Sequence, residues 1–545
     1  MRRLSPPGLQ NKSREELMAS SNSRHWKQVT AVFKSIVGRR IIPVLILLIC
    51  MISILHRMRD QVRMTTYQIC NAVLAARIMN ATLVLPRLDT NSFWHDKRYD
   101  IQRTATVGET NALPANCPAS KLLDITNKDQ CTGHGVYEVD YETAIGTCRC
   151  HACFTGSDCS VSDDSCIIDL YQGDPTMYEN YWHENGDSCT TTIFGWQRMS
   201  YYANSMQFFF VQTELDQIIR SLHAVIGNAV TKDRHIVIGV GSTQLYQAAL
   251  YALSPSDRPV PTKVVAAAPF YSSYPMITDF LQSSLYRWAG DAAAFKPSSD
   301  DDSYIELVTS PNNPTGEIRE SVVKGTGATV HDLAYYWPHH TPITAPADHD
   351  LMLFSVSKST GHAGTRIGWA IVKDLDVAQK MAKFIVLNTI GVSKDAQIRA
   401  AQILRAVTKQ YRELGGKIPY PSDNAGPGHG PPKQLFHFAS AEMSYRWQRL
   451  RSILSMGTKF SVPEFDPAWC SFFGESRRPT PAFAWLRCGE VEDCELFLRQ
   501  YGILTRSGSY FGSQANYVRL SLLDRRATFE ILVDRLEKLQ LMVDR

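Results

Sequence analysis

The chain has 545 residues, which is more than one ordinary hydrophobic core organises, so two or three structural units are expected. Its composition, 44% hydrophobic and 20% charged, is that of a globular protein and excludes a largely disordered one. The net charge of +4 is uneven, because residues 1–60 carry 11 Lys or Arg against 3 Asp or Glu. The rest of the chain is slightly acidic, which argues against a nucleic-acid-binding surface.

The basic excess surrounds an apolar segment that we predict to be a membrane anchor. Residues 41–55 contain no charged side chain, and arginines stand on both sides of them. A helix of that length spans about 22 Å, less than the roughly 30 Å of a hydrocarbon core, and snorkelling arginines reduce the difference. A buried core helix is the alternative. We predict a basic cytoplasmic tail at 1–40, a transmembrane signal anchor at 41–58, and a lumenal location for the rest, in the secretory pathway, the vacuole or the extracellular space.

Residues 61–97 combine a helical pattern at 67–79 with a short strand at 81–86 and a polar loop. This order resembles the opening helix, strand and loop of plant O-fucosyltransferase-like proteins. The resemblance stops there, so we infer no sugar transfer. We interpret the segment as a fused relic or a chimeric gene model.

Six cysteines crowd into the stretch from 131 to 166, with glycines among them. They are Cys131, Cys148, Cys150, Cys153, Cys159 and Cys166. Such density indicates a disulfide framework formed in an oxidising compartment. Zinc is the alternative, because Cys150 and Cys153 have ligand spacing, but no second pair is placed to complete the site. We therefore predict disulfides and no metal.

The cysteine spacing at 117–167 resembles the epidermal-growth-factor-like (EGF-like) domain found in front of plant alliinases. The resemblance implies three pairs: Cys131 with Cys148, Cys150 with Cys159, and Cys153 with Cys166. Cys117 is left over. Near the other end of the chain, Cys488 and Cys494 stand at a predicted strand-to-helix junction and are candidates for one more disulfide.

From residue 168 to 545, short strand-like runs alternate with helical patterns. Strands are expected at 235–240, 263–268, 304–308, 328–331 and 351–354. Helices are expected at 244–253, 378–388 and 396–411, and 415–433 is rich in Gly and Pro and is expected to be a loop. Alternation of this kind predicts an α/β fold with a mostly parallel sheet flanked by helices. The tail from 483 mixes strand and helix and predicts a small C-terminal α/β domain.

The stretch around Lys358 carries the chemistry that organises the rest. An apolar run at 351–354 leads into it, hydroxyl side chains flank the lysine, and Arg366 follows eight residues later. A lysine at the end of a buried strand is desolvated, which lowers its pKa and frees its amine to form an imine with an aldehyde. Hydroxyls and an arginine suit a phosphate. Aldehyde and phosphate together describe pyridoxal 5′-phosphate (PLP), whereas a solvated loop is the alternative for this motif alone.

Four further motifs lie near predicted strand ends or in a strand, and each has an ordinary structural explanation. Ser242 and Thr243 open a helix, where they form an anion site or a simple N-cap. Asn313 precedes a proline in a turn. Asp332 ends a strand, where it pairs with a pyridine nitrogen or merely closes a turn. Arg519 lies in an apolar strand and needs an anion, either a substrate carboxylate or a salt-bridge partner.

In order and spacing, these motifs resemble those of fold-type I PLP enzymes. Residues 173–178, 268–271, 331–338 and 357–374 are similar to the alliinase and tryptophan aminotransferase-related family of plants. The resemblance implies that Lys358 holds PLP covalently and moves the Cα proton of the substrate. It implies cofactor contacts for Tyr178, Ser242, Thr243, Tyr271, Asn313, Asp332, Tyr335, Ser355, Ser357 and Arg366, and substrate contacts for Gly173, Tyr201 and Arg519. Tyr178 is expected to reach the phosphate of a neighbouring subunit, which implies a homodimer with shared sites.

The resemblance leaves two reactions open on the same residues. A transaminase acting on an L-amino acid of the tryptophan type releases an oxo acid such as indole-3-pyruvate. An alliinase-type C–S lyase expels a sulfenate from an S-alkyl-L-cysteine sulfoxide and leaves pyruvate and ammonia. Residues 174–178 and 331–335 favour the transaminase, whereas the cysteine module favours the lyase. A tethered binding protein with a decayed site is disfavoured, because every cofactor position carries a competent residue.

Overall fold

The computed structural model describes residues 131–139, 146–163, 165–202, 208–297, 303–413 and 433–541. All of them belong to one compact unit, Pro118–Arg545. The predicted tail, anchor and O-fucosyltransferase-like segment, 1–97, lie outside the described residues, as do Cys117 and most of the predicted loop at 415–433. Within the described ranges, no helix is both long enough and apolar enough to cross a membrane.

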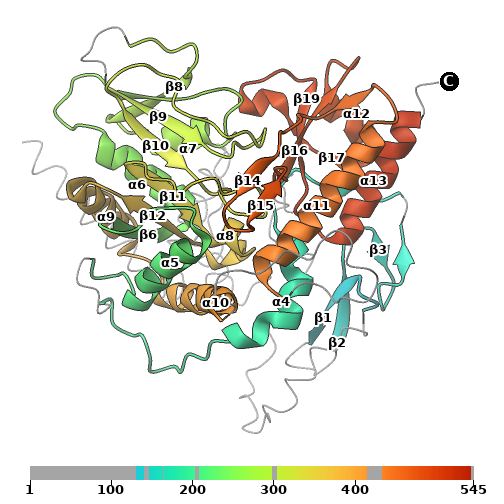
Figure 1. Ribbon diagram of the computed structural model, residues 1–545, viewed down its shortest axis with the longest axis horizontal. Coiled ribbons are helices and arrows are strands. Elements are labelled where there is room, and N and C mark those ends of the chain that lie inside the picture. The colour runs from blue at the N-terminus through green and yellow to red at the C-terminus, as the bar shows by residue number, and fades with distance from the viewer. Residues whose placement is uncertain are drawn as a thin grey trace, which may run out of the picture. The chain divides into compact units, whose positions relative to one another are not determined.

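A seven-stranded sheet forms the centre of the larger domain (Figure 1), in the order β6-β12-β11-β10-β9-β7-β8. Its strands are β6 (His235–Val240), β7 (Thr262–Ala266), β8 (Tyr286–Asp291), β9 (Tyr304–Thr309), β10 (Ala328–Asp332), β11 (Leu351–Ser355) and β12 (Ile367–Val372). Only β12 runs antiparallel to its neighbours, β11 and β6. The predicted mostly parallel sheet is therefore confirmed. Every residue of β9, β11 and β12 is buried, as expected for strands covered on both faces.

Helices pack around this sheet in pairs. α6 (Gly241–Leu253) packs against α9 (Leu375–Thr389), and α5 (Thr213–Ile226) packs against α10 (Lys394–Arg412). The shorter helices are α4 (Glu179–Asn185), α7 (Tyr274–Phe280) and α8 (Val356–Ser359), with 3-10 turns η2 (Thr176–Tyr178), η3 (Gly186–Cys189), η4 (Ala363–Thr365) and η5 (Gly508–Phe511). The helices expected at 378–388 and 396–411 are present and extend a few residues further at the ends.

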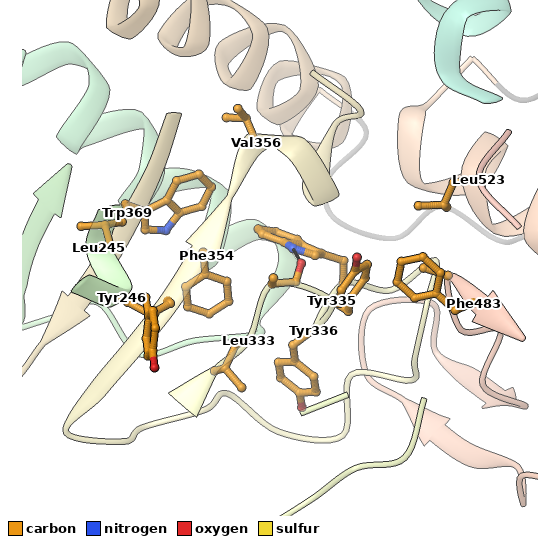
Figure 2. Close-up of a cluster of buried hydrophobic side chains, with 14 of the residues drawn as sticks. Leu245, Tyr246, Leu333, Tyr335, Tyr336, Phe354, Val356, Trp369, Phe483 and Leu523 are labelled. Carbon is orange, nitrogen blue, oxygen red and sulfur yellow. Dashed lines mark hydrogen bonds between the residues drawn. The ribbon is translucent and has the colours of Figure 1, made fainter. Parts of the chain in front are cut away.

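An aromatic cluster fills the space between β11, β12 and α5 (Figure 2). Phe354 and Trp369 stack with ring centroids 6.0 Å apart, and Trp337 packs edge-on against both. The Trp369 indole N–H donates to Nε2 of His223 at 2.9 Å. Burial lowers the pKa of His223 to about 4, so the ring stays neutral and accepts this hydrogen bond. The cluster fixes the strand that leads to Lys358.

The C-terminal part forms a smaller domain around a four-stranded antiparallel sheet, β13-β16-β19-β18. Its strands are β13 (Phe460–Ser461), β16 (Phe483–Cys488), β18 (Arg506–Ser507) and β19 (Tyr517–Ser521), with a hairpin of β14 (Ala468–Cys470) and β15 (Glu475–Arg477). Helices α11 (Leu435–Leu454) and α13 (Arg526–Leu541) pack on each other, and α12 (Cys494–Gln500) follows β16. The strands and helices predicted for the C-terminal region are thus present, within the same compact unit as the large sheet.

Three disulfides hold the small module that precedes these domains. They join Cys131 to Cys148, Cys150 to Cys159, and Cys153 to Cys166, which confirms the expected pairing. The strands of the module are β1 (Gly135–Val139), β2 (Gly146–Cys150), β3 (Phe154–Thr155) and β4 (Val161–Ser162). A fourth disulfide joins Cys488 to Cys494, also as expected.

The cysteine module contacts the C-terminal domain through a strand pair and a hydrogen bond. Just beyond its last cysteine, β5 (Ile168–Asp169) pairs in parallel with β17 (Ile503–Leu504). Arg535 on α13 donates to the carbonyl oxygen of Cys166 at 2.8 Å. The module therefore packs in a defined position against the C-terminal domain.

We expect the paired substitution Cys153→Ser with Cys166→Ser to loosen the module without unfolding the large sheet. The two cysteines are 13 residues apart, and closing a loop of that size stabilises a fold by about 3 kcal/mol. Limited proteolysis should then cut within 131–166, while the main thermal transition shifts little. Ser160→Ala, an exposed change in the same module, is the control. Unchanged protease resistance would contradict a stabilising role for this disulfide.

Candidate active site

The sheet topology brings the predicted residues to one edge. Because β6, β7, β9, β10 and β11 are parallel, their carboxyl ends lie at the same edge of the sheet. Each of these strands is followed by, or ends on, a predicted site residue: Ser242, Tyr271, Asn313, Asp332 and Lys358, respectively. The antiparallel β12 enters the sheet from that edge, directly after Arg366. The sheet thus gathers residues that are far apart in the sequence.

Lys358 lies in α8, a single helical turn that directly follows β11. The Oγ of Ser355 caps this turn by accepting the backbone N–H of Ser357 at 3.1 Å. The Nζ of Lys358 donates to the carbonyl oxygen of Gly173 at 3.1 Å. Burial, reinforced by the positive charge of Arg519, lowers the pKa of Lys358 to about 8. The amine is therefore much closer to its neutral, nucleophilic form than an exposed lysine is.

Asp332, the last residue of β10, offers a buried carboxyl group on the strand next to β11. Its Oδ2 accepts the hydroxyl of Tyr274 at 3.0 Å, and its Oδ1 accepts the backbone N–H of Ala334 at 3.1 Å. Burial raises the pKa of Asp332, and the two donors together with the charge of Lys358 oppose that rise. Sequence analysis missed Tyr274, because a tyrosine at the start of a helix carries no local mark of this contact.

Arg519 on β19 is buried at the junction with the smaller domain, with 3% of its surface exposed. One Nη donates to Oδ1 of Asn313 at 3.1 Å, and the other donates to the carbonyl oxygen of Tyr171 at 2.8 Å. Its Nε has no hydrogen-bond partner. Burial and the charge of Arg506 lower the pKa of Arg519 to about 9. Arg519 is thus held in place by neutral groups, with one donor still open.

The residues predicted for a phosphate converge at the N-terminus of α6. A Cβ built on Gly241, which has φ +70°, meets a guanidinium nitrogen of Arg366 at 2.4 Å. A Cβ on Gly368 meets the backbone nitrogen of Ser242 at 2.6 Å, and Gly368 pairs with Ser355 across the sheet. The glycines thus allow the helix N-terminus and the guanidinium to approach each other. A helix N-terminus beside an arginine and hydroxyl groups is a good anion site.

Two aromatic side chains complete the surroundings of Lys358. Its Nζ lies 5.5 Å from the ring centroid of Tyr335, which packs edge-on against Phe483 (Figure 2). Burial raises the pKa of Tyr335, so its hydroxyl keeps its proton at neutral pH. Tyr271 packs edge-on against Tyr274, the partner of Asp332, at 5.3 Å. Both predicted tyrosines therefore stand close to the lysine or to the carboxyl group.

Two predicted residues lie away from the contacts of Lys358 described above. Tyr178 is 2% exposed and packs against His339 and Gly361 of its own chain, and its contact with a neighbouring subunit stays a prediction. Its buried hydroxyl has no hydrogen-bond partner and is therefore free to bind a polar group of a ligand. Tyr201, expected at the substrate, is 68% exposed and belongs to a surface segment. The structure does not bring it to Lys358 within one chain.

The residues present fit PLP. A buried lysine of lowered pKa, a buried carboxyl group, and an arginine at a helix N-terminus match the aldehyde, the ring nitrogen and the phosphate, respectively. When bound, PLP supplies an electron sink for negative charge that develops at Cα of an amino acid. No group of three or more metal-ligating side chains occurs in the described ranges.

Comparison with known proteins agrees with this site. Residues 168–540 match the sequence model of the family described as allinase. The chain is 52% identical over 391 residues to tryptophan aminotransferase-related protein 2 of Oryza sativa subsp. japonica, covering 70% of this chain and 75% of that protein. It is 53% identical to the protein of the same name in Arabidopsis thaliana, covering 69% and 82%. It is 36% identical to alliin lyase of Allium cepa var. aggregatum, covering 74% and 89%.

A second family matches the segment before the cysteine module. Residues 62–106 match the model of the family described as GDP-fucose protein O-fucosyltransferase. This match confirms the resemblance drawn from residues 61–97. The matched residues lie outside those that the structure describes.

We expect Lys358→Met to stabilise the cofactor-free protein in a pH-dependent way. The folded-state pKa of Lys358, about 8, lies below its usual 10.5, so the folded protein disfavours the ammonium form. The variant should melt at a higher temperature than the parent below pH 8, and the difference should shrink between about pH 8 and 10.5. Thermal melts across this range check it, with the exposed Lys383→Met on α9 as control. A difference independent of pH would contradict a desolvated lysine.

Proposed function

The chain belongs to the alliinase family of PLP-dependent enzymes, and we propose that it is an aminotransferase acting on an L-amino acid of the tryptophan type. The observation that carries this proposal is the half-buried amine of Lys358 in the turn after β11, which donates to the carbonyl oxygen of Gly173 and feels the charges of Arg519 and Asp332. Relatives named tryptophan aminotransferase-related are 52–53% identical to it, whereas the alliin lyase is 36% identical. The arrangement of strands around the site is that of fold-type I.

The residues of the chain divide the work of such a reaction. Arg519 binds the α-carboxylate of the amino acid through its open Nε and the outer edge of its guanidinium. Lys358, whose lowered pKa suits a base near neutral pH, takes the proton from Cα. Asp332, held by Tyr274 and the Ala334 N–H, presents an anionic oxygen where the ring nitrogen needs one. The burial of these groups excludes water and strengthens each electrostatic contact.

A C–S lyase is the second candidate, because the chain shares its family and 36% of its aligned residues with an alliin lyase. Both reactions begin when Lys358 removes the Cα proton. Lysis then needs a sulfenate leaving group at Cβ, whereas transamination returns a proton and releases an oxo acid. The substrate side chain and its surroundings therefore decide between the two reactions.

The compartment that we propose is the lumen of the secretory pathway, with the chain tethered by residues 41–58. Four disulfides in the described residues support an oxidising environment. One of them, Cys488–Cys494, belongs to the enzyme domain itself rather than to the small module. The whole described part is thus suited to the same compartment.

We also propose that the enzyme is a homodimer that uses the surface segment at 194–202. Five of its large apolar or aromatic side chains are exposed: Phe194, Trp196, Met199, Tyr201 and Tyr202. A contiguous apolar segment of this kind is typical of an interface. A second copy is the proposed occupant, because the segment includes Tyr201, a residue expected at the active site that its own chain leaves outside. If Tyr201 inserts into the active site of a second copy, the same contact covers the exposed apolar segment and brings Tyr201 to a substrate.

The reaction is tested on the full-length protein supplied with PLP. L-Tryptophan with an oxo acid should give indole-3-pyruvate, and Lys358→Ala should lower the rate by at least about a hundredfold, since a positioned base contributes that much. Product formation is followed by chromatography, and Lys383→Ala is the control. Pyruvate and ammonia formed from an S-alkyl-L-cysteine sulfoxide, without indole-3-pyruvate from tryptophan, would assign the lyase instead.

The dimer is tested by sedimentation equilibrium. Trp196→Ser combined with Tyr202→Ser should shift the protein toward monomer, because the substitutions remove exposed apolar area from the proposed interface. Phe280→Ser is the control, because Phe280 is 72% exposed but lies on α7, outside the proposed interface. It should leave the mass unchanged. Equal masses for parent, double variant and control would count against this segment as the interface.

A further inference from the structure

Two buried arginines stand side by side at the junction with the smaller domain. Arg506 on β18 pairs with Arg519 on β19 in an antiparallel register, which puts their side chains on the same face. Only 7% of Arg506 and 3% of Arg519 is exposed. Like charges directly opposite each other destabilise a sheet. The fold thus accepts the repulsion between two buried guanidinium groups, and an anionic ligand would offset that repulsion.

Neutral groups receive the hydrogen bonds that fix the two guanidinium groups. Arg506 donates to Oγ of Ser272 at 2.8 Å, and Arg519 donates to Asn313 and to the carbonyl oxygen of Tyr171. Within the described part of the chain, no ion pair involves either arginine, and the Nε of each has no hydrogen-bond partner. A buried charge needs an anionic partner. Two buried charges therefore leave places for two anionic groups.

Arg506 is placed against the same segments that build the site around Lys358. Its guanidinium lies 4.1 Å from the ring centroid of Tyr171, whose carbonyl oxygen holds Arg519. Its hydrogen-bond partner, Ser272, follows Tyr271 directly. Gly173, two residues after Tyr171, accepts the hydrogen bond of Lys358. Arg506 thus packs against the same two segments, 171–173 and 271–272, that contact Arg519 and Lys358 or carry Tyr271.

We propose that Arg506 binds the second carboxylate of a dicarboxylic oxo acid, the acceptor of the amino group. The inference rests on the proposed aminotransferase function and names the class of its co-substrate. Arg519 neutralises the carboxylate next to the oxo group, and Arg506 neutralises the distal one. A monocarboxylic acceptor leaves the charge of Arg506 buried and unpaired, so it binds more weakly.

The exchange balances without any further reactant. The amino group of the donor takes the place of the oxo oxygen of the acceptor, which leaves as water, and a second water supplies the oxo oxygen of the donor's product, so that water cancels over the whole exchange. The products are the oxo acid of the donor and a dicarboxylic amino acid, with no net oxidation. An aromatic donor is compatible with the same arginine, because a guanidinium also stacks on aromatic rings, as that of Arg506 does on Tyr171.

The test compares 2-oxoglutarate with pyruvate as acceptor, with L-tryptophan as donor and the full-length PLP-loaded protein. Arg506→Gln should lower kcat/KM for 2-oxoglutarate by about 30-fold or more, mainly through KM, because it removes one partner of a buried charge pair. The kcat/KM for pyruvate should change less than about threefold, because pyruvate has no second carboxylate for Arg506 to bind. Arg506→Lys, which keeps the charge, should recover part of the loss. Arg487→Gln, on the exposed face of β16 in the same sheet, is the control.

A binding measurement separates recognition from turnover. Glutarate, a dicarboxylate without an oxo group, should bind the parent protein more tightly than propionate in calorimetry, and Arg506→Gln should remove that preference. Equal losses with both acceptors, or an unchanged glutarate affinity, would overturn the inference and make Arg506 a structural residue. In that case the proposed aminotransferase function is unaffected, because the parent protein still turns over with pyruvate as the acceptor. Parent protein inactive with both acceptors would overturn the proposed function, and the inference with it.

Discussion

The desolvation of cationic side chains at one edge of the sheet is the constraint on which the site depends. Arg506 and Arg519 are buried and Lys358 is half-buried, and the desolvation lowers the pKa values of Lys358 and Arg519. In water, the lysine would be a protonated, unreactive ammonium. Burial next to a second cation makes it a usable amine, and it makes the arginines strong binders of carboxylates.

The sheet topology makes this concentration of charge possible. Six of the seven strands are parallel and end at the same edge, and five of them lead into a loop or helix start that carries a site residue. The antiparallel strand β12 adds Arg366 from the opposite direction and places Gly368 against the backbone of Ser242. The aromatic cluster around Trp369 and Phe354 packs the neighbouring strands β12 and β11 against α5. Rigid packing here keeps the lysine and its neighbours in fixed positions.

Much of this protein was predictable from local patterns. The alternation of strands and helices predicted the sheet, and the cysteine spacing, through its resemblance to a known module, predicted three disulfides that the structure contains. Asp332 and Lys358 were recognisable because each directly ends or follows an apolar strand. Tyr274 and Arg506 were not, because their contacts are with residues 58 and 234 positions away, and no local pattern reports such pairs.

The sequence by itself determined which chemical groups the chain carries and the order in which strands deliver them, since both follow from side-chain type and hydrophobic periodicity. Only the tertiary structure decided which groups meet. It buried Tyr178, left Tyr201 on the surface of its own chain, and placed Arg506 directly opposite Arg519 on the neighbouring strand. The physical reason is that burial and pairing depend on long-range packing, and packing is what fixes the charge state and the partner of each buried side chain.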